Sequence, residues 1–248
     1  MTEPVVLITG ATAGIGRATA LAFGREGARL MCTGRNATAG AALIADLRTL
    51  GAEAEFVAAD VSNEAQVCDL VERTVARFGR LDVAVNSAGT EGTPGSIVDQ
   101  TVETYSATFD ANVLGTFLCM KHELRVMLQQ QQGVVVNLSS TMGSRGNAQN
   151  PMYVASKHAI EGLTKSAALE AGRSNVRVNA VAPGPIDTGM LERIAGGAER
   201  IAAVAATIPF GRIGTPDEVA DAIVFLASDR ARYVSGQILA VNGGKTAM

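Results

Sequence analysis

The fold of this chain is decided near its start, by the stretch VVLITGATAGIG at residues 5–16. A short apolar run leads into glycines at 10, 14 and 16, and a helical pattern follows over 14–26. Glycines permit a tight turn and let backbone N–H groups approach a ligand without a clash from a Cβ atom. The first turn of the helix adds unsatisfied N–H groups and a positive partial charge. The stretch predicts a strand, a phosphate-binding turn and a helix, although such glycines also serve simple helix–strand packing.

The alternation of strand and helix continues along the chain. Mostly unbroken apolar runs predict further strands, buried on both faces, at 28–34, 54–60, 81–89, 134–140, 176–184 and 237–244. Amphipathic segments between them predict helices at 37–50, 63–78, 103–130, 152–172 and 216–227. This order predicts an α/β fold, a Rossmann-like doubly wound parallel sheet of about seven strands with helices on both faces. Since no repeat, linker or low-complexity tract interrupts it, we expect a single domain over residues 1–248.

One segment departs from this rhythm. Residues 185–215 are rich in Gly and Ala, include Pro185 and Pro209, and stand where a strand should lead directly into a helix. Long excursions of this kind are commonly functional. We expect a substrate loop or lid at about 186–212, with a surface embellishment as the alternative.

Composition narrows the class of partner. Hydrophobic residues make up 47% of the chain and charged residues 18%, which is typical of a globular protein. The formal net charge of −3 argues against a nucleic-acid or anionic-membrane surface, because both attract basic proteins. Three dispersed cysteines and two histidines offer no metal cluster, and the N-terminus lacks the pattern of a signal peptide. We therefore expect a cytoplasmic protein that binds a small molecule, no nucleic acid, no membrane and no metal.

The end of the second strand indicates which nucleotide binds. An NAD site has an acid there to accept a hydrogen bond from the ribose 2′-OH. No Asp or Glu occurs from Gly27 to Ala45, and Arg35 instead offers a cation with a geometry suited to a 2′-phosphate. We therefore expect NADP(H) in preference to NAD(H), the alternative being that Arg35 is a solvated loop residue.

A tyrosine and a lysine stand four residues apart in the stretch YVASK, at Tyr153 and Lys157. Positions i and i+4 share one face of a helix, so the phenol and the ammonium can converge on one site. A cation about 4 Å from the phenol, at an effective dielectric of about 20, supplies the roughly 4 kcal/mol that would lower a pKa of about 10 toward about 7. The pair predicts a tuned acid–base group; the alternative is that Tyr153 is a core residue.

Together these motifs resemble the short-chain dehydrogenase/reductase family. The resemblance runs from about Val5 to Gly244. It is carried by TGxxxGIG at 9–16, NSAG at 86–89, Asn112, Ser140, YxxxK at 153–157 and PGPIDT at 183–188. In the family a second asparagine usually stands where this chain has Ser87, which leaves the detail of that turn open.

The resemblance implies a role for each catalytic residue. Tyr153 would be the general acid in reduction and the general base in oxidation, and Lys157 would lower its pKa and hold the nicotinamide ribose. Ser140 would donate a hydrogen bond to the substrate oxygen, although the neighbouring Ser139 stays open as an alternative. Asn112, which is otherwise a plain polar helix residue, would anchor a water that relays protons from the lysine.

The resemblance also implies a cofactor site. Asp60 would contact the adenine, although it is equally suited to a plain turn, and the 183–188 segment would orient the nicotinamide. The full set of implied cofactor-binding residues is Gly10, Ala13, Gly14, Ile15, Gly16, Arg35, Asp60, Val61, Asn86, Ala88, Gly89, Tyr153, Lys157, Pro183, Gly184, Ile186 and Thr188.

The expected function is NAD(P)-dependent hydride transfer between a secondary alcohol and a ketone, as in an alcohol dehydrogenase or ketoreductase. The resemblance implies a homotetramer, for which residues 103–172 could supply an interface. Thr141, Met142, Asn147 and Met190, together with the loop, suggest an uncharged substrate of medium size. Two alternatives stay open: a 3-oxoacyl-thioester reductase of fatty-acid synthesis, and a non-catalytic cofactor-binding sensor or scaffold. A methyltransferase is disfavoured because the second strand does not end in an acid.

Overall fold

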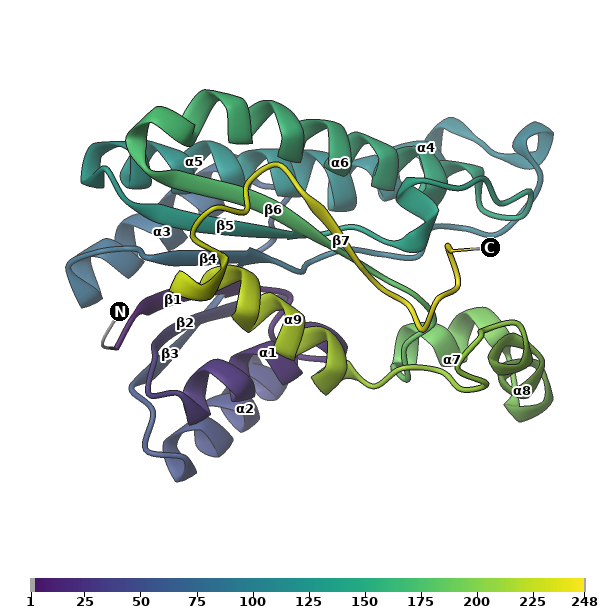
Figure 1. Cartoon of the computed structure of the whole chain (residues 1–248), viewed down its shortest axis with the longest axis horizontal. Helices are drawn as coiled ribbons and strands as arrows, with labels where there is room; N and C mark the ends of the chain where they lie inside the picture. The colour runs from purple at the N-terminus through teal and green to yellow at the C-terminus, as the bar shows by residue number, and fades with distance from the viewer. Residues whose placement is uncertain (1–2, 248) are drawn as a thin grey trace.

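Seven parallel strands form the centre of the computed structural model, which describes residues 3–247 (Figure 1). Their order across the sheet is β3-β2-β1-β4-β5-β6-β7, and every neighbouring pair is parallel. The expected Rossmann-like doubly wound sheet is thus confirmed. The strands are β1 Val5–Thr9, β2 Arg29–Gly34, β3 Ala54–Ala58, β4 Val83–Asn86, β5 Gly133–Leu138, β6 Val176–Pro183 and β7 Ile238–Val241.

Helices cover both faces of this sheet (Figure 1). One face carries α1 Gly14–Arg25, α2 Ala37–Thr49 and α9 Pro216–Ala227; the other carries α3 Glu64–Phe78, α4 Val102–Phe109, α5 Gly115–Gln130 and α6 Pro151–Ala171. Side chains alternate along the strands, so Val6 and Ile8 of β1 pack toward the first face while Val5 and Leu7 pack toward the second. Both faces of the central strands are therefore buried, as their unbroken apolar runs predict.

Local sequence fixes where the helices begin. Asn36 accepts a hydrogen bond from the Ala39 N–H at 3.0 Å and so caps the start of α2. Thr215 and Glu218 form a reciprocal capping box at the start of α9, with a proline in the first turn. Such caps satisfy N–H groups that the helix itself leaves unpaired, which explains why these boundaries fall within two residues of the expected ones.

The expected helix at 103–130 is interrupted. It divides into α4 and α5, which are joined by a turn of π-helix at Asp110–Leu114. A π turn inserts one extra residue into the helical ladder and is common at functional sites. Asn112 lies in the middle of this turn and is fully buried.

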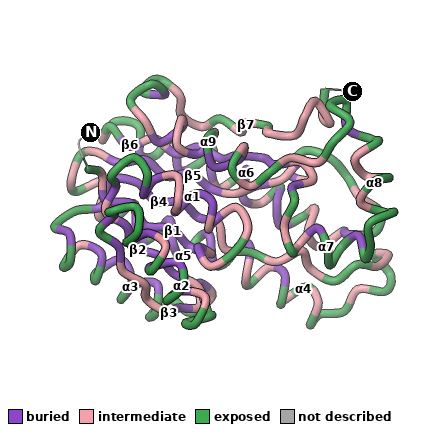
Figure 2. Tube along the Cα trace, turned by 90° about the horizontal axis from the view of Figure 1, so that it is seen from below, coloured by how far each residue is buried: buried purple, intermediate pink, exposed green. Residues whose placement is uncertain are grey.

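The 185–215 excursion folds into two short helices, α7 Gly189–Ala195 and α8 Ala198–Ala206. They stand beyond the carboxyl ends of the strands, away from the helices that cover the sheet (Figure 1). Figure 2 shows that burial is concentrated in the strands, whereas α8 has no buried residue. A segment with so little buried apolar surface depends weakly on the core for its position.

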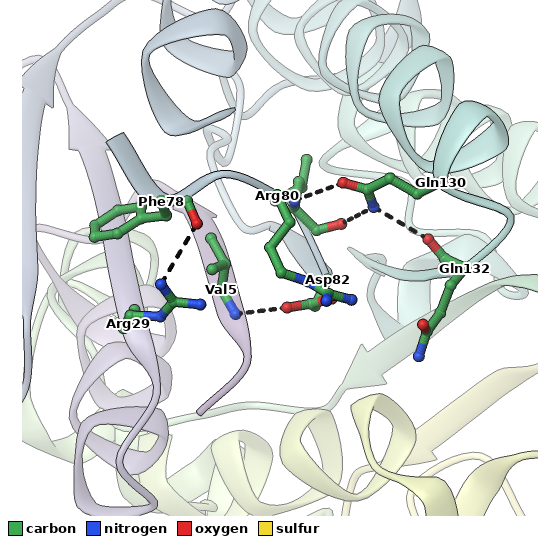
Figure 3. Close-up of polar contacts among 8 residues, drawn as sticks. Val5, Arg29, Phe78, Arg80, Asp82, Gln130 and Gln132 are labelled. Carbon is green, nitrogen blue, oxygen red and sulfur yellow. Dashed lines mark hydrogen bonds and ion pairs between the residues drawn. The ribbon is translucent and has the colours of Figure 1, made fainter. Parts of the chain in front are cut away.

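The amino edge of the sheet is closed by polar contacts (Figure 3). Asp82, which is only 2% exposed, accepts a hydrogen bond from the Val5 N–H at 2.9 Å and pairs with Arg80. Gln130 accepts from the Leu81 N–H at 2.9 Å and donates to the Leu81 carbonyl at 2.7 Å. These bonds pair the backbone polar groups at the starts of β1 and β4. The edge of the sheet that remains available to a ligand is therefore the carboxyl edge.

A buried carboxyl group, that of Glu123, lies on α5, on the face of the sheet that also carries α3, α4 and α6. Glu123 is fully buried and accepts a hydrogen bond from the Asn86 side chain at 3.0 Å. The same Asn86 amide donates to Asn137 at 3.0 Å, and Asn137 donates to Thr164 at 2.9 Å. Burial raises the pKa of Glu123 to about 7, and the hydrogen bond from Asn86 opposes the shift. Ionising this group therefore costs folding free energy.

We predict that Glu123→Gln raises the free energy of unfolding, relative to the wild type, more at pH 8 than at pH 5. A Glu pKa raised to about 7 in the folded state means that the unfolded chain loses its proton first, so wild-type stability falls as pH rises from about 4.5 to about 7. Glutamine keeps the bond to Asn86 without titrating. The difference in unfolding free energy should change by about 2–3 kcal/mol between the two pH values. Urea denaturation measures it, with the exposed Glu26→Gln as control; a pH-independent difference would contradict the assignment.

Candidate active site

The turn after β1 presents free N–H groups at the carboxyl edge. The residue that precedes α1, Ala13, provides no side-chain cap, so the first turn of that helix keeps its donors available. Gly10 and Gly14 have φ values of 65° and 49°, which favour glycine. A Cβ atom on Gly16 would lie 2.3 Å from the Gly10 carbonyl oxygen. The turn is thus drawn tightly against the helix, and its donors fit the pyrophosphate of a dinucleotide.

The same turn touches the loop that follows β4. The Thr9 hydroxyl accepts hydrogen bonds from the N–H groups of Ser87 and Ala88, at 3.1 and 3.2 Å. A Cβ atom on Gly10 would lie 2.8 Å from the backbone of Ala88. β1 and β4 are the strands at which the order of the sheet reverses. Ligands of open α/β sheets bind at such a switch point, outside the carboxyl ends of the strands.

Arg35 and Asp60 lie near each other beyond β2 and β3. Arg35 is exposed. Asp60 accepts from both the N–H and the hydroxyl of Ser62, at 2.9 and 2.7 Å, and these bonds lower its pKa, with a smaller contribution from Arg35. Asp60 therefore forms a turn just beyond the carboxyl end of β3. Val61 is buried against Gly115.

Asn86 points into the protein. Ala84 and Asn86 lie on the same face of β4 because side chains alternate along a strand, and that face is covered by α5. The Asn86 amide is engaged with Glu123 and Asn137. Any contact between this residue and a cofactor would come from its backbone.

Tyr153, Ser140 and Lys157 converge where β5 meets α6. Ser140 follows β5, and its side chain lies close enough to Tyr153 to lower the pKa of the phenol. Lys157 is one helical turn further along α6, and its Nζ lies 5.5 Å from the centre of the Tyr153 ring. The lysine is buried and donates to the Leu138 carbonyl at 2.8 Å. The i, i+4 spacing thus brings the phenol and the ammonium to one site, as the sequence predicts.

The expected lowering of the Tyr153 pKa is wrong for this structure. Burial raises the pKa of Tyr153 to about 12, and the charge of Glu91 adds to the rise, whereas the hydrogen bond with Ser140 opposes it. Burial also lowers the pKa of Lys157 to about 8. The ammonium does not offset the burial because it is directed at a backbone carbonyl and not at the phenol oxygen. Tyr153 therefore carries its proton at neutral pH.

Asn112 links three segments of the site. Its side chain donates to the Thr90 carbonyl and to the Ser156 hydroxyl, both at 3.0 Å, and accepts from the Thr90 N–H at 2.7 Å. A Cβ atom on Gly89 would lie 2.9 Å from the Asn112 side-chain oxygen and 3.9 Å from Lys157 Nζ. The π turn thus places a fully bonded amide beside the lysine.

Ser139 and Ser140 have different surroundings. Ser139 is buried and donates to Glu161 of α6 at 2.8 Å. Ser140 faces Tyr153 and accepts a hydrogen bond from the Met142 N–H at 3.2 Å. Because neighbouring residues of extended backbone point to opposite sides, Ser140 and not Ser139 lies at the Tyr153 phenol.

The segment after β6 closes the other side of the site. The Gly184 N–H donates to the carbonyl of Val241, the last residue of β7, at 2.9 Å, and a Cβ atom on Gly184 would lie 2.9 Å from Asn242. Thr188 caps α7 and lies against Gly14, where a Cβ atom would be 3.2 Å from its methyl group. The segment therefore runs past the start of α1, where it could cover a bound dinucleotide.

Sequence reasoning missed Glu91 and Arg193. Glu91 lies in the loop after β4 and forms an ion pair with Arg193 of α7 at 2.6 Å. The position of Glu91 just beyond a strand at the carboxyl edge could have marked it as a candidate from the sequence. Its pairing with Arg193, 102 residues away, could not have been predicted. Among residues 3–247 no group of three or more His, Cys, Asp or Glu side chains could hold a metal ion. No helix in that range has the length and apolar character to cross a membrane.

Comparison with known proteins identifies the family. A family model described as enoyl-(acyl carrier protein) reductase matches residues 10–246. The cis-4-hydroxycyclohexanecarboxylate dehydrogenase of Sinomonas cyclohexanicum is 41% identical over 246 residues, which cover 99% of this chain and 98% of that protein. The chain belongs to the short-chain dehydrogenase/reductase family.

Other members of the short-chain dehydrogenase/reductase family agree with this assignment. The 3-oxoacyl-[acyl-carrier-protein] reductase FabG of Thermotoga maritima is 38% identical over 240 residues, covering 97% of this chain and 96% of that protein. The crystal structure of levodione reductase has a TM-score of 0.97 and 36% identity, covering 100% of this chain and 99% of that one. The structure of ElxO with NADP bound has a TM-score of 0.93 and 33% identity, covering 99% and 100%.

As a short-chain dehydrogenase/reductase, this protein is an NAD(P)-dependent oxidoreductase that interconverts a secondary alcohol and a ketone. It uses a nicotinamide cofactor and acts on a small molecule.

The two serines provide a matched test of the site. We predict that Ser140→Ala lowers kcat about 10²- to 10³-fold, because a hydrogen bond to the developing charge is lost. Ser139→Ala should instead lower stability by about 1–3 kcal/mol, because Glu161 loses a buried partner. Steady-state kinetics and urea denaturation of both variants separate the effects. Equal loss of kcat in the two variants would contradict the assignment of Ser140.

Proposed function

We propose that this enzyme is an NADP(H)-dependent reductase of uncharged, medium-sized ketones. The observation that carries the proposal is the protonated Tyr153 phenol, which lies with Ser140 and the buried Lys157 where β5 meets α6. The phenol keeps its proton at neutral pH, so it has a proton to give to the oxygen of a ketone that is being reduced. The segment 186–212, with α7 and α8, is proposed as the lid over the substrate.

The chain's own groups account for the proton transfer. Tyr153 donates its proton to the carbonyl oxygen of the ketone, and the Ser140 hydroxyl donates a hydrogen bond to the same oxygen as negative charge develops there. A reduced nicotinamide, when bound, supplies the hydride to the carbonyl carbon. The Lys157 ammonium, 5.5 Å from the centre of the Tyr153 ring, is held in place by the Leu138 carbonyl, and Asn112 ties the Thr90 loop to α6. Hydride and proton together convert the ketone into the alcohol.

A variant of Tyr153 distinguishes an enzyme from a cofactor-binding scaffold. We predict that Tyr153→Phe lowers the reduction rate about 10²- to 10⁴-fold, because the proton donor is removed while the ring is retained. NADPH affinity, followed by cofactor fluorescence, should stay within a few-fold of the wild type. A variant that retains most of its activity would mean that Tyr153 is not the acid.

Arg35 is the residue on which the cofactor preference depends. It is exposed just after β2, and residues 27–45 contain no Asp or Glu that could bind a ribose 2′-OH. We predict that Arg35→Ala weakens NADPH binding about 10- to 100-fold, as expected for loss of a charged hydrogen bond, and changes NADH binding little. Fluorescence titration with each cofactor measures this, with the exposed Arg48→Ala as control. Tighter binding of NADH than of NADPH to the wild type would overturn the proposal.

A second candidate is reduction of a 3-oxoacyl thioester, which the name of the Thermotoga maritima relative supports for that protein. A carrier-protein substrate would need a basic surface near the site. Arg177 does not offer one, because its guanidinium donates to backbone carbonyls at the end of α9, Leu226 and Ser228 among them. The uncharged-ketone proposal therefore stands first, and parallel assays with a free ketone and an acyl thioester compare the two.

The homotetramer stays a prediction, to be measured by light scattering. The surface that it would use carries large exposed apolar side chains on α4, the π turn, α5 and α6, namely Tyr105, Leu114, Phe117 and Leu169.

A further inference from the structure

The side-chain amide of Asn137 joins four elements of the fold. Asn137 is the penultimate residue of β5 and is fully buried. Its Oδ1 accepts a hydrogen bond from Asn86 of β4 at 3.0 Å. Its Nδ2 donates to the hydroxyl of Thr164 on α6 at 2.9 Å and to the sulfur of Met120 on α5 at 3.2 Å. Each polar atom of this amide therefore has a partner, and the partners come from β4, α5 and α6.

The hydrogen-bond network continues beyond Asn137 at both ends. The Asn86 amide also donates to Glu123 of α5, at 3.0 Å. The Thr164 hydroxyl donates in turn to the Ile160 carbonyl, at 2.8 Å. The side chains of this network are buried, and a buried polar group that loses its partner is costly. The network therefore holds the carboxyl ends of β4 and β5 against α5 and α6 in one arrangement.

Leu138, the residue after Asn137, carries the carbonyl that receives the Lys157 ammonium, at 2.8 Å. The pairing of β4 with β5 ends at Asn86 and Asn137, so this carbonyl lies one residue beyond it. A strand end beyond its ladder is held less firmly than the strand interior. The Asn137 amide is thus the adjacent anchor that holds the Leu138 carbonyl on the side of β4.

Lys157 and Thr164 set α6 against this same end of β5. They are seven residues apart on one helix, which is about two turns, so they share a face of α6. Thr164 accepts from the Asn137 amide, and Lys157 donates to the Leu138 carbonyl. The Lys157 Nζ lies 5.5 Å from the centre of the Tyr153 ring. A shift of the end of β5 relative to α6 therefore moves the ammonium relative to the phenol.

We propose that Asn137 is a positioning residue for the hydride-transfer reaction, because its amide holds the end of β5 where the Leu138 carbonyl receives the Lys157 ammonium. The inference rests on the proposed function, in which Lys157 stands beside the reacting phenol. Because Asn137 is fully buried, it acts through Leu138 and not on the substrate.

The test compares two buried threonines. Thr164 on α6 and Thr74 on α3 are both fully buried, and each donates its hydroxyl to the carbonyl four residues earlier at 2.8 Å. Within the described residues 3–247, only Thr164 of the two also accepts a hydrogen bond from Asn137. Valine has nearly the shape of threonine. Thr164→Val and Thr74→Val therefore remove the same bond within a helix, but only Thr164→Val deprives the Asn137 amide of a partner.

We predict that Thr164→Val lowers kcat about tenfold with NADPH and cyclohexanone as the test ketone, because a displaced group near the reaction is costly to the rate. The KM of the ketone should stay within about twofold of the wild type, since Thr164 lies away from solvent. Thr164→Ser keeps the hydroxyl and should restore most of the lost kcat. Thr74→Val should lower the melting temperature as much as Thr164→Val does, with kcat unchanged.

A second variant tests the same amide from α5. Met120→Leu removes the sulfur that accepts from Asn137 with little change of volume, so it should fold even if Thr164→Val does not. It should lower kcat in the same direction, by a smaller factor, because sulfur is a weak acceptor.

A measurement that needs no turnover follows Lys157 directly. Nitrogen-15 NMR of protein labelled at lysine detects the ammonium of Lys157, which is assigned by its absence from the spectrum of Lys157→Met. The bond to the Leu138 carbonyl slows the exchange of these protons with water. The signal should shift or broaden in Thr164→Val and should match the wild type in Thr74→Val.

Three results would overturn the inference. One is an unchanged kcat in Thr164→Val, or in Met120→Leu where Thr164→Val does not fold. Another is an equal loss of kcat in Thr164→Val and Thr74→Val, which would mean that stability alone is affected. The third is a Lys157 signal that neither Thr164→Val nor Met120→Leu alters. A wild type that reduces no uncharged ketone would instead contradict the proposed function, and a signal altered in Thr164→Val alone would still support the placement of Lys157 by Asn137.

Discussion

The close approach of two backbone segments is the constraint on which the site depends. Gly10 lies so near Ala88 that a Cβ atom would come within 2.8 Å of the backbone, and Gly16 allows the same approach to Gly10 itself. Because Gly10 and Gly16 lack side chains, the turn after β1 packs directly against the loop after β4. The start of α1 therefore faces the loop that carries Gly89 and Glu91. The glycine turn after β1 and the loop after β4 thereby meet at the switch point of the sheet.

A second constraint is the irregular turn at Asp110–Leu114. A regular helix from 103 to 130 would leave Asn112 in an ordinary helical position, whereas the π turn directs its amide to Thr90 and Ser156. Those bonds tie the β4 loop to α6, the helix that carries Tyr153 and Lys157. The local irregularity is offset by the three hydrogen bonds of the fully buried Asn112 side chain, so it is stable where an unpaired buried asparagine would not be.

Sequence alone predicted the sheet, its helices and the convergence of Tyr153 with Lys157, because strand runs, glycine turns and i, i+4 spacing are all local patterns. It did not predict the π turn, since no residue type is diagnostic of an inserted helical residue. The direction of the Tyr153 pKa was wrong because the partner of Lys157 is a backbone carbonyl, which leaves no mark in a sequence. The Glu91–Arg193 pair joins segments that only the folded chain brings together.

The base of the 185–215 excursion has a consequence for how such enzymes diverge. Pro185 and Gly214 are joined by a 3.0 Å hydrogen bond, and the Asp187 N–H donates to the Gly214 carbonyl at 2.9 Å. The two ends of the excursion are therefore hydrogen-bonded to each other. Because of these bonds, a change in the length or sequence of the excursion should disturb β6 and α9 little. The proposed lid is therefore a unit whose length and sequence can change while β6 and α9 keep their positions in the sheet and its covering layer.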